Sequence, residues 1–281
     1  MTQSHRIPGK GLMIDRTRPV RFTFDGKGYE GFAGDSVASA LLANGERLIG
    51  RSFKYHRPRG VMTAGSEDPN ALIEVHESGQ QTPNVRCTVQ EIYEGLDARS
   101  QNHVGPLNFD LLAVNDLLAP FFSAGFYYKT FMWPRAFWEK LYEPAIRRAA
   151  GLGRLSGKHD LGLYEKAFAF CDLLVIGAGP AGLMAALTAA RAGAEVILAD
   201  EDRRMGGRLL ADQPKIDGRN GADWAAQVVA ELTAMPNVTL MTRTTVTGAY
   251  DDGTFGALER VSLHRAPGEA PRECFWRIHA R

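Results

Sequence analysis

The sequence contains few cysteines and no long run of apolar residues. Its three cysteines, Cys87, Cys171 and Cys274, are odd in number and far apart. This argues against a disulfide framework and favours a reducing compartment. No apolar run reaches the roughly 18 residues that a membrane-spanning helix needs, and the first residues lack the apolar core of a signal peptide. We therefore expect a cytoplasmic protein with no membrane partner.

The sequence also lacks an excess of either charge. Lys and Arg number 33 and Asp and Glu number 32, which gives a net charge of +1, so we expect no nucleic-acid partner. Neither a Cys-x-x-Cys pair nor a His-Glu-x-x-His motif is present, and these are common arrangements of zinc ligands. We interpret the scattered histidines as surface or core residues: His56, His76, His103, His159, His264 and His279. The sequence therefore predicts no catalytic residue and no metal site.

A length of 281 residues is enough for about two domains. The first part of the chain has the pattern of a small α+β module. Residues 1–19 are polar and basic, and we expect them to form an arm that is not packed. From residue 20, alternating apolar residues lead into a turn at Asp25-Gly26. A helix capped by Asp35 or Ser36 follows, and its apolar positions are Val37, Ala40 and Leu41. Later strands complete a β-grasp module over residues 20–96.

Residues 97–170 are rich in aromatic residues at helical spacing, interrupted at Pro120, Pro134 and Pro144. We expect them to form a helical connector. Two interpretations of its aromatic residues remain open. They form a core between domains, or they form a surface that docks a partner protein, since aromatic residues are enriched at interfaces.

A glycine turn near residue 177 marks an α/β nucleotide-binding domain over residues 171–281. Gly177, Gly179 and Gly182 form a Gly-x-Gly-x-x-Gly motif, with Pro180 and Ala181 inside it. An apolar strand precedes the motif and an alanine-rich helix follows, which is the context of a dinucleotide site. Gly179 lets the backbone approach a pyrophosphate, and the N-terminus of the helix supplies N–H groups.

Asp200 ends the next predicted strand, about 20 residues past the glycines, where a carboxylate accepts hydrogen bonds from ribose hydroxyls. This favours NAD or FAD over NADP, because a carboxylate repels a 2′-phosphate. Glu201 and Asp202 add negative charge. The arginines that follow, Arg203 and Arg204, either hold a 2′-phosphate or form a solvated or ion-paired stretch.

Gly206 and Gly207 come six and seven residues after Asp200. An acid followed by Met-Gly-Gly at this distance is typical of the two-dinucleotide flavoproteins, in which the chain doubles back over the adenosine. The motif by itself leaves FAD and NAD open.

Three stretches together resemble one family. They are FYYKTFMWPRAFWEKLYEPAIRRAAGLGRL, HDLGLYEKAFAFCDLLVIGAGPAGLMAAL and ADEDRRMGGRLL, and they are similar to the α subunit of heterotetrameric sarcosine oxidase. The resemblance implies a ferredoxin-like β-grasp module followed by an NAD site. It implies contacts to NAD from Ala181, Asp200, Glu201, Asp202 and Arg208.

The resemblance also implies partners and cofactors. The complete enzyme oxidises sarcosine to glycine and forms H2O2 with formaldehyde or methylene-tetrahydrofolate. Its β, γ and δ subunits would be the partners of this chain, and FAD and FMN would belong to the assembled complex. We expect this chain alone to be inactive.

The ferredoxin-like module lacks the cysteines of its cluster-bearing relatives. A [2Fe–2S] cluster needs four thiolates, and the module offers only Cys87. We therefore predict that no iron–sulfur cluster is bound here.

The predicted nucleotide domain lacks the apolar strand and Ala-Thr-Gly turn that close the sheet in this flavoprotein class. We expect an incomplete Rossmann-like domain and an N-terminal piece of a longer subunit. Two alternatives remain open. The chain belongs to a related FAD- or NAD-dependent amine, opine or cyanide-forming oxidoreductase, or it is a non-catalytic assembly module.

Overall fold

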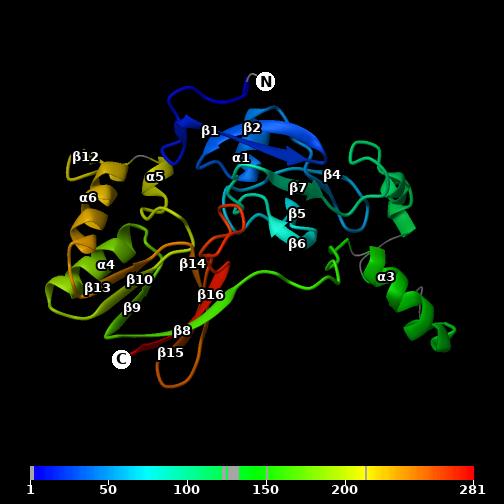
Figure 1. Cartoon of the computed structure of the whole chain (residues 1–281). Coiled ribbons are helices and arrows are strands. Elements are labelled where there is room, and N and C mark those ends of the chain that lie inside the picture. Colours follow the sequence, from blue (N-terminus) through cyan, green and yellow to red (C-terminus); the bar gives the residue numbers. More distant parts are fainter. Residues whose placement is uncertain (1–2, 122–124, 126–132, 150, 213) are drawn as a thin grey trace. The chain divides into compact units, whose positions relative to one another are not determined.

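The computed structural model describes residues 3–121, 125, 133–149, 151–212 and 214–281. The chain has mixed α/β structure and divides into two compact units (Figure 1). Unit 1 contains the residues up to Gly9 and Ile14–Asp160, and unit 2 contains Lys10–Met13 and Leu161–Arg281. The short segment Lys10–Met13 therefore belongs with the C-terminal part of the chain, although its neighbours on both sides belong to unit 1.

A five-stranded sheet with the order β2-β1-β7-β5-β6 forms the centre of unit 1. Its strands are β1 (Asp15–Phe24), β2 (Lys27–Ala33), β5 (Leu72–Glu77), β6 (Gln80–Arg86) and β7 (Leu96–Ser100). β1 and β7 are parallel, and the other pairs are antiparallel. Asp25 and Gly26 both have positive φ, as a two-residue hairpin turn often requires. Because β7 is central, the sheet continues past residue 96, where we had predicted that the module ends.

Helix α1 (Val37–Ala43) packs on this sheet. Ser36 caps it, because its hydroxyl accepts the N–H of Ser39 while the Ser39 hydroxyl accepts the N–H of Ser36. The apolar positions predicted from the sequence are buried in the core: Val37, Ala40 and Leu41. The predicted helix is confirmed.

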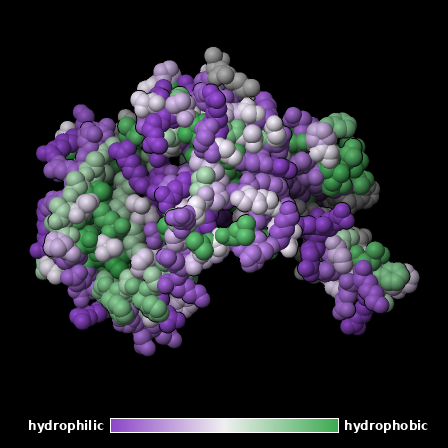
Figure 2. Space-filling view, in the orientation of Figure 1, coloured by the Kyte–Doolittle hydropathy of each residue, from purple (hydrophilic) through white to green (hydrophobic). Residues whose placement is uncertain are grey.

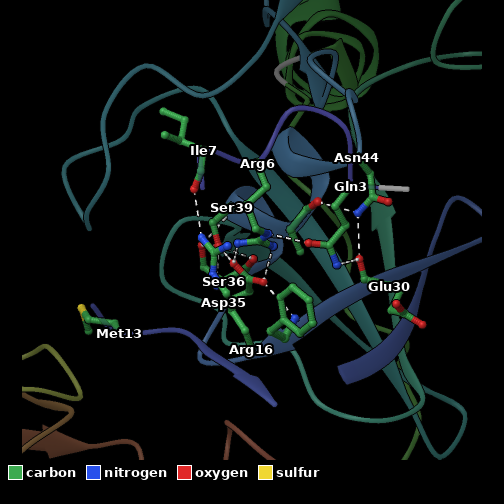
Figure 3. Close-up of polar contacts among 12 residues, drawn as sticks. Gln3, Arg6, Ile7, Met13, Arg16, Glu30, Asp35, Ser36, Ser39 and Asn44 are labelled. Carbon is green, nitrogen blue, oxygen red and sulfur yellow. Dashed lines mark hydrogen bonds and ion pairs between the residues drawn. The ribbon is translucent and has the colours of Figure 1, made fainter. Parts of the chain in front are cut away.

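The N-terminal arm is packed against unit 1 through a buried ion pair. The guanidinium of Arg6 donates to both oxygens of the Asp35 carboxylate, at 3.1 and 2.6 Å (Figure 3). Gln3 donates its side-chain amide to the carbonyl of Glu30 at 3.0 Å. The expectation of an unpacked arm over residues 1–19 is wrong for this part. The partners lie far away in the sequence, where periodicity gives no signal.

Small elements complete unit 1. They are β3 (Gly50–Arg51), β4 (Pro58–Arg59), the 3-10 helices η1 (Leu111–Asp116), η2 (Ala119–Phe121) and η3 (Arg135–Phe137), the π-helical turn η4 (Trp138–Tyr142) and helix α3 (Glu143–Ala149). β3 and β4 form an antiparallel pair. Where the structure describes it, the predicted helical connector over residues 97–170 is a series of short helices. Its last residues are not helical, because Tyr164–Cys171 form a strand of unit 2.

The described part of the connector exposes apolar side chains. Leu117 and Trp133 are 80% and 83% exposed, and Figure 2 shows hydrophobic surface over η1 and η2. Residues 122–124 and 126–132, which hold much of the predicted aromatic segment, lie outside the described residues.

A three-stranded parallel sheet with the order β13-β10-β9 organises unit 2. Its strands are β9 (Leu173–Ile176), β10 (Val196–Ala199) and β13 (Val238–Met241). Helices α4 (Pro180–Arg191) and α6 (Gly221–Thr233) pack together against it. The remaining elements of this layer are α5 (Leu209–Asp212), β11 (Lys215–Ile216) and β12 (Arg219–Asn220).

A second sheet in unit 2 has the order β14-β15-β16-β8. Its strands are β8 (Tyr164–Cys171), β14 (Thr244–Ala249), β15 (Thr254–Glu259) and β16 (Glu273–Ala280). Cys171, Ile197 and Ile278 are buried in the core that joins the two sheets. The stretch VTLMTRTTVTGAY, which we expected to be one strand, is divided between β13 and β14. Arg243 has a φ of 53°, which breaks the extended conformation.

Candidate functional site

The glycine turn lies between β9 and α4. Gly177 has a φ of 93°, a conformation that side chains rarely adopt. A Cβ atom built on Gly182 would lie 1.9 Å from the carbonyl oxygen of Gly177. Gly182 is therefore required for the close approach of the helix to the turn. By contrast, a Cβ atom on Gly179 would meet no atom within 4 Å, so the space in front of Gly179 is open.

The N-terminus of α4 faces this turn. Gly179 is the N-cap residue and makes no side-chain capping bond, and Pro180 is the first helical residue. The next N–H groups, those of Ala181 and Gly182, have no acceptor one turn earlier in the helix. These groups and the positive end of the helix dipole form a site for an anion.

The Asp200 carboxylate lies beside the glycine turn. Its Oδ2 accepts the backbone N–H of Ala178 at 2.5 Å, and its Oδ1 accepts the backbone N–H of Asp202 at 2.8 Å. Each oxygen keeps further acceptor capacity. The carboxylate can therefore bind hydroxyl donors while it remains tied to the turn.

The segment after Asp200 returns to the same turn. Gly206 donates its N–H to the carbonyl of Ala178 at 2.9 Å. A Cβ atom on Gly207 would lie 3.0 Å from the Cα of Gly179, and both Gly206 and Gly207 have positive φ. The structure thus brings the glycine turn, the acid and the glycine pair together.

Three of the residues predicted from the sequence make contacts outside the turn. Arg208 is 86% exposed and pairs with Asp212 at 2.8 Å. The side chains of Glu201 and Asp202 are exposed, and their carbonyls accept hydrogen bonds from Arg260 and from the backbone N–H of Arg243.

The sequence did not reveal that the segment Lys10–Met13 contacts the loop that follows Asp200. Arg203 donates to the carbonyl of Met13, and Arg204 donates to the carbonyl of Leu12 at 2.8 Å. The contact spans about 190 residues of sequence, so no local pattern indicates it.

Two histidines of unit 1 lie against acidic side chains. His56 is buried and its Nδ1 lies 2.6 Å from a carboxylate oxygen of Asp110. His76 pairs with Glu74 at 3.3 Å. His56 matches the interpretation of a core residue.

In unit 1, the carboxylate of Asp68 holds the backbone of the surrounding loop. The Asp68 carboxylate is buried and accepts backbone N–H groups at 2.6–2.9 Å from Met62, Thr63, Asn70 and Ala71. Burial acts to raise the pKa of Asp68, but the four N–H donors outweigh it and hold this pKa below its ordinary value.

Two family models match parts of the chain. The model of a 2Fe-2S iron-sulfur cluster binding domain matches residues 17–103, and the model of a FAD dependent oxidoreductase matches residues 172–221. The second match spans the glycine turn, Asp200 and the Gly206-Gly207 pair.

The curated relatives match almost the whole chain. The alpha subunit of sarcosine oxidase from Rhizobium meliloti is 59% identical over 279 residues, which is 99% of this chain and 28% of the relative. The alpha subunit of sarcosine oxidase from Corynebacterium sp. strain P-1 is 37% identical over 99% of this chain and 25% of its own length. This chain is related to the N-terminal part of sarcosine oxidase alpha subunits. It spans about a quarter of the length of these relatives.

Other proteins are similar over less sequence or only in fold. An opine oxidase subunit from Agrobacterium tumefaciens is 44% identical over 82 residues, or 27% of this chain and 16% of the relative. The structure of L-proline dehydrogenase from P. horikoshii matches 94% of this chain and 40% of its own chain, with a TM-score of 0.57 and 18% identity. The latter likeness shows the fold alone.

The match to the iron–sulfur family corrects a prediction made from the sequence. We had predicted that no iron–sulfur cluster belongs to this chain. The match over residues 17–103 points to an iron–sulfur domain and contradicts that prediction, which rested on the single cysteine of the module.

The side chains of this range differ from the usual ligand set. A [2Fe–2S] cluster is held by four cysteine thiolates, and residues 17–103 contain one cysteine, Cys87. Burial, with a contribution from nearby Asp68, raises the pKa of the Cys87 thiol to about 12. Among the described residues, no three or more His, Cys, Asp or Glu side chains form a group that could hold a metal ion. These residues do not fit the cluster.

The helices of both units are short or amphipathic. Within the described residues, no helix has both the length and the apolar character needed to cross a membrane.

Proposed function

We propose that this chain is the NAD-binding part of the alpha subunit of a sarcosine-oxidising complex. The observation that carries the proposal is the contrast between two glycines. A Cβ atom on Gly182 would clash with the backbone of the glycine turn, whereas a Cβ atom on Gly179 would meet no neighbouring atom. The open space at Gly179 lies at the N-terminus of α4, and Asp200 is held against the same turn, so a dinucleotide pyrophosphate has room to approach the helix N-terminus.

The residues of the site take distinct roles in this proposal. The N–H groups of Ala181 and Gly182 receive the pyrophosphate at the start of α4. Asp200 accepts the hydroxyls of the adenosine ribose, and its negative charge disfavours a 2′-phosphate. The other proposed contacts are Gly177, Gly179, Pro180, Glu201, Asp202, Gly206 and Gly207. Arg208 joins them only after it leaves its pair with Asp212.

A bound nicotinamide dinucleotide supplies hydride transfer, and the chain binds and orients it. We propose that sarcosine oxidation to glycine, with formation of H2O2 and formaldehyde or methylene-tetrahydrofolate, takes place only in the assembled complex. The names of the relatives support this, since they are designated subunits. The β, γ and δ subunits are the proposed partners, and the chain alone is proposed to be inactive.

The finer fold assignments belong to the same proposal. Unit 1 has the sheet-and-helix composition of a β-grasp module, and unit 2 has the parallel sheet, glycine turn and helix of a Rossmann-like domain. The iron-sulfur and FAD family matches, which fall one in each unit, support this division.

FAD is the second candidate for the dinucleotide. The FAD dependent oxidoreductase model matches residues 172–221, and FAD carries the same adenosine and pyrophosphate as NAD. Asp200 and the glycine turn are compatible with both.

The experiment is to purify the chain, record its visible spectrum, and identify any nucleotide released on denaturation by mass spectrometry. The proposal predicts NAD and no flavin absorbance. Stoichiometric FAD with a flavin spectrum would replace NAD by FAD. Failure of both NAD and FAD to bind when added to the chain would leave the non-catalytic assembly module as the function.

A further inference from the structure

Two arginines tie the N-terminal segment Lys10–Met13 to the loop that follows Asp200. Arg203 donates to the carbonyl of Met13, and Arg204 donates through Nη1 to the carbonyl of Leu12 at 2.8 Å. Both acceptors are backbone atoms of a segment that clusters with unit 2 and not with its neighbours in sequence. Charged donors make the stronger class of hydrogen bond, so the segment is held at two consecutive carbonyls.

The same loop is also held by residues at the start of β14 and just after β15. The N–H of Thr244 donates to the carbonyl of Asp200 at 2.8 Å, and the N–H of Arg243 donates to the carbonyl of Asp202 at 2.9 Å. The guanidinium of Arg260 donates to the carbonyl of Glu201 at 2.5 Å. The backbone of this acidic loop, residues 200–204, is therefore fixed by residues next to β14 and β15, and its two arginines bind the N-terminal segment.

We propose that Arg203, Arg204 and the segment Lys10–Met13 form a clamp that positions the acidic loop for NAD, and that the two arginines are positioning residues and not ligands of a 2′-phosphate. The proposal rests on the function proposed above, because it assigns a role within the same dinucleotide site. It adds an N-terminal element that is about 190 residues away in sequence from the loop.

The clamp also accounts for cofactor choice. A 2′-phosphate site needs arginine donors directed at the ribose, and here donors of Arg203 and Arg204 are directed at the carbonyls of Met13 and Leu12. These hydrogen bonds fix where each guanidinium lies, so to bind NADP the remaining N–H donors would have to reach the ribose from that position while Asp200 repelled the phosphate. The hydrogen bonds of Arg203 and Arg204 to the N-terminal segment therefore both position the loop and keep these arginines from acting as ligands of a 2′-phosphate.

The first measurement is equilibrium binding of NAD and of NADP to the 281-residue chain and to its variants. Replacing both arginines by alanine is expected to weaken NAD binding about fivefold to tenfold, equivalent to the loss of roughly one hydrogen bond of ordinary strength. NADP is expected to remain the weaker ligand in every variant. Arg203→Lys with Arg204→Lys is expected to recover part of the NAD affinity. Arg191→Ala is the matched control, since Arg191 is an exposed arginine of unit 2 that pairs with Glu231.

The second measurement is the rate of trypsin cleavage after Lys10, followed by intact mass. Cleavage needs the segment to leave the acidic loop, so it reports the clamp directly. The double alanine variant is expected to be cleaved several-fold faster than the wild-type chain, and the Arg191→Ala control is expected to be cleaved at the wild-type rate.

The outcomes separate the clamp from the proposed function. Unchanged cleavage after Lys10 in the double alanine variant would overturn the clamp. Faster cleavage with unchanged NAD affinity would overturn its positioning role. Selective loss of NADP binding in that variant would show that the arginines are phosphate ligands. If the wild-type chain binds neither NAD nor FAD, the proposed function fails together with the positioning role, whereas the cleavage rates still decide whether the clamp exists.

Discussion

The carboxylate of Asp200 accepts the backbone N–H of Ala178 at 2.5 Å, across 22 residues of sequence. This one hydrogen bond joins the end of β10 to the glycine turn after β9. The acid that would bind the ribose and the turn that would bind the pyrophosphate are therefore parts of one structure. Any change at Asp200 is expected to affect both.

Asp200→Ala is expected to weaken NAD binding by about tenfold to a hundredfold, because hydrogen bonds from the ribose to a charged acceptor are lost. Asp200→Asn keeps the size of the side chain and removes its charge, so it is the matched variant. It is expected to reduce the preference for NAD over NADP. Calorimetric titration measures both effects, and an unchanged NAD affinity in Asp200→Ala would exclude this residue from the site.

Alanine substitutions at two glycines of the turn are expected to have different effects, one on stability and the other on dinucleotide affinity. Gly182→Ala places a Cβ atom 1.9 Å from a backbone oxygen, so the helix must shift. Overpacking of this kind destabilises by about 1–3 kcal/mol. Gly179→Ala meets no atom within 4 Å and is expected to keep the melting temperature within a degree or two of wild type while it loses dinucleotide affinity.

Thermal denaturation and NAD titration of both variants test this pair. Equal stability losses in Gly179→Ala and Gly182→Ala would contradict the geometry of the turn. Full NAD affinity in a stable Gly179→Ala variant would contradict the position assigned to the pyrophosphate.

The lowered pKa of Asp68 leads us to expect that the stability of unit 1 depends on pH. Its pKa is held below the ordinary value in the folded chain, so its contribution to the free energy of unfolding is complete above the unfolded pKa of about 3.9. The contribution is lost as the pH falls through the lower, folded pKa. Asp68→Asn is expected to cost about 2–3 kcal/mol at neutral pH, because the neutral amide is a weaker acceptor for the four N–H groups.

Urea denaturation of the wild-type chain and of Asp68→Asn between pH 2 and 7 gives the check. The difference in stability between the two is expected to shrink toward acid pH. A difference that does not depend on pH would mean that the charge of Asp68 is not what holds the loop.

Arg6→Ala is expected to destabilise unit 1 by about 3–5 kcal/mol, since it leaves the buried carboxylate of Asp35 without its cation. The Asp35 side chain is fully buried and that of Arg6 is 10% exposed. A surface pair serves as the control: Lys27→Ala removes a pair with Glu46 whose side chains are 55% and 34% exposed and is expected to destabilise the chain far less than Arg6→Ala does. Equal costs in the two variants, measured by denaturant unfolding, would contradict the buried character of the Arg6 pair.

Local features of the sequence predicted the local parts of the structure. The Gly177–Gly182 turn and the start of α1 were anticipated because each depends on residues within a few positions of one another. The sequence also indicated that Gly206 and Gly207 return to the glycine turn, through a spacing that is typical of one class of protein.

The features that the sequence did not reveal depend on distant partners. The Arg6–Asp35 pair and the contacts of Arg203 and Arg204 with Lys10–Met13 join residues that periodicity cannot connect. The division between β13 and β14 follows from the left-handed backbone of Arg243, which apolar alternation does not signal. The sequence indicated a ferredoxin-like module, but the prediction that it binds no cluster rested on its single cysteine and is contradicted by the iron–sulfur family match, which extends over residues 17–103.

The most direct test of the central claim is calorimetric titration of NAD and NADP into the chain after removal of any copurified nucleotide. The account predicts that NAD binds with a stoichiometry of one and that NADP binds at least about tenfold more weakly, because Asp200 repels the 2′-phosphate. Absence of NAD binding, or equal affinity for NAD and NADP, would contradict it.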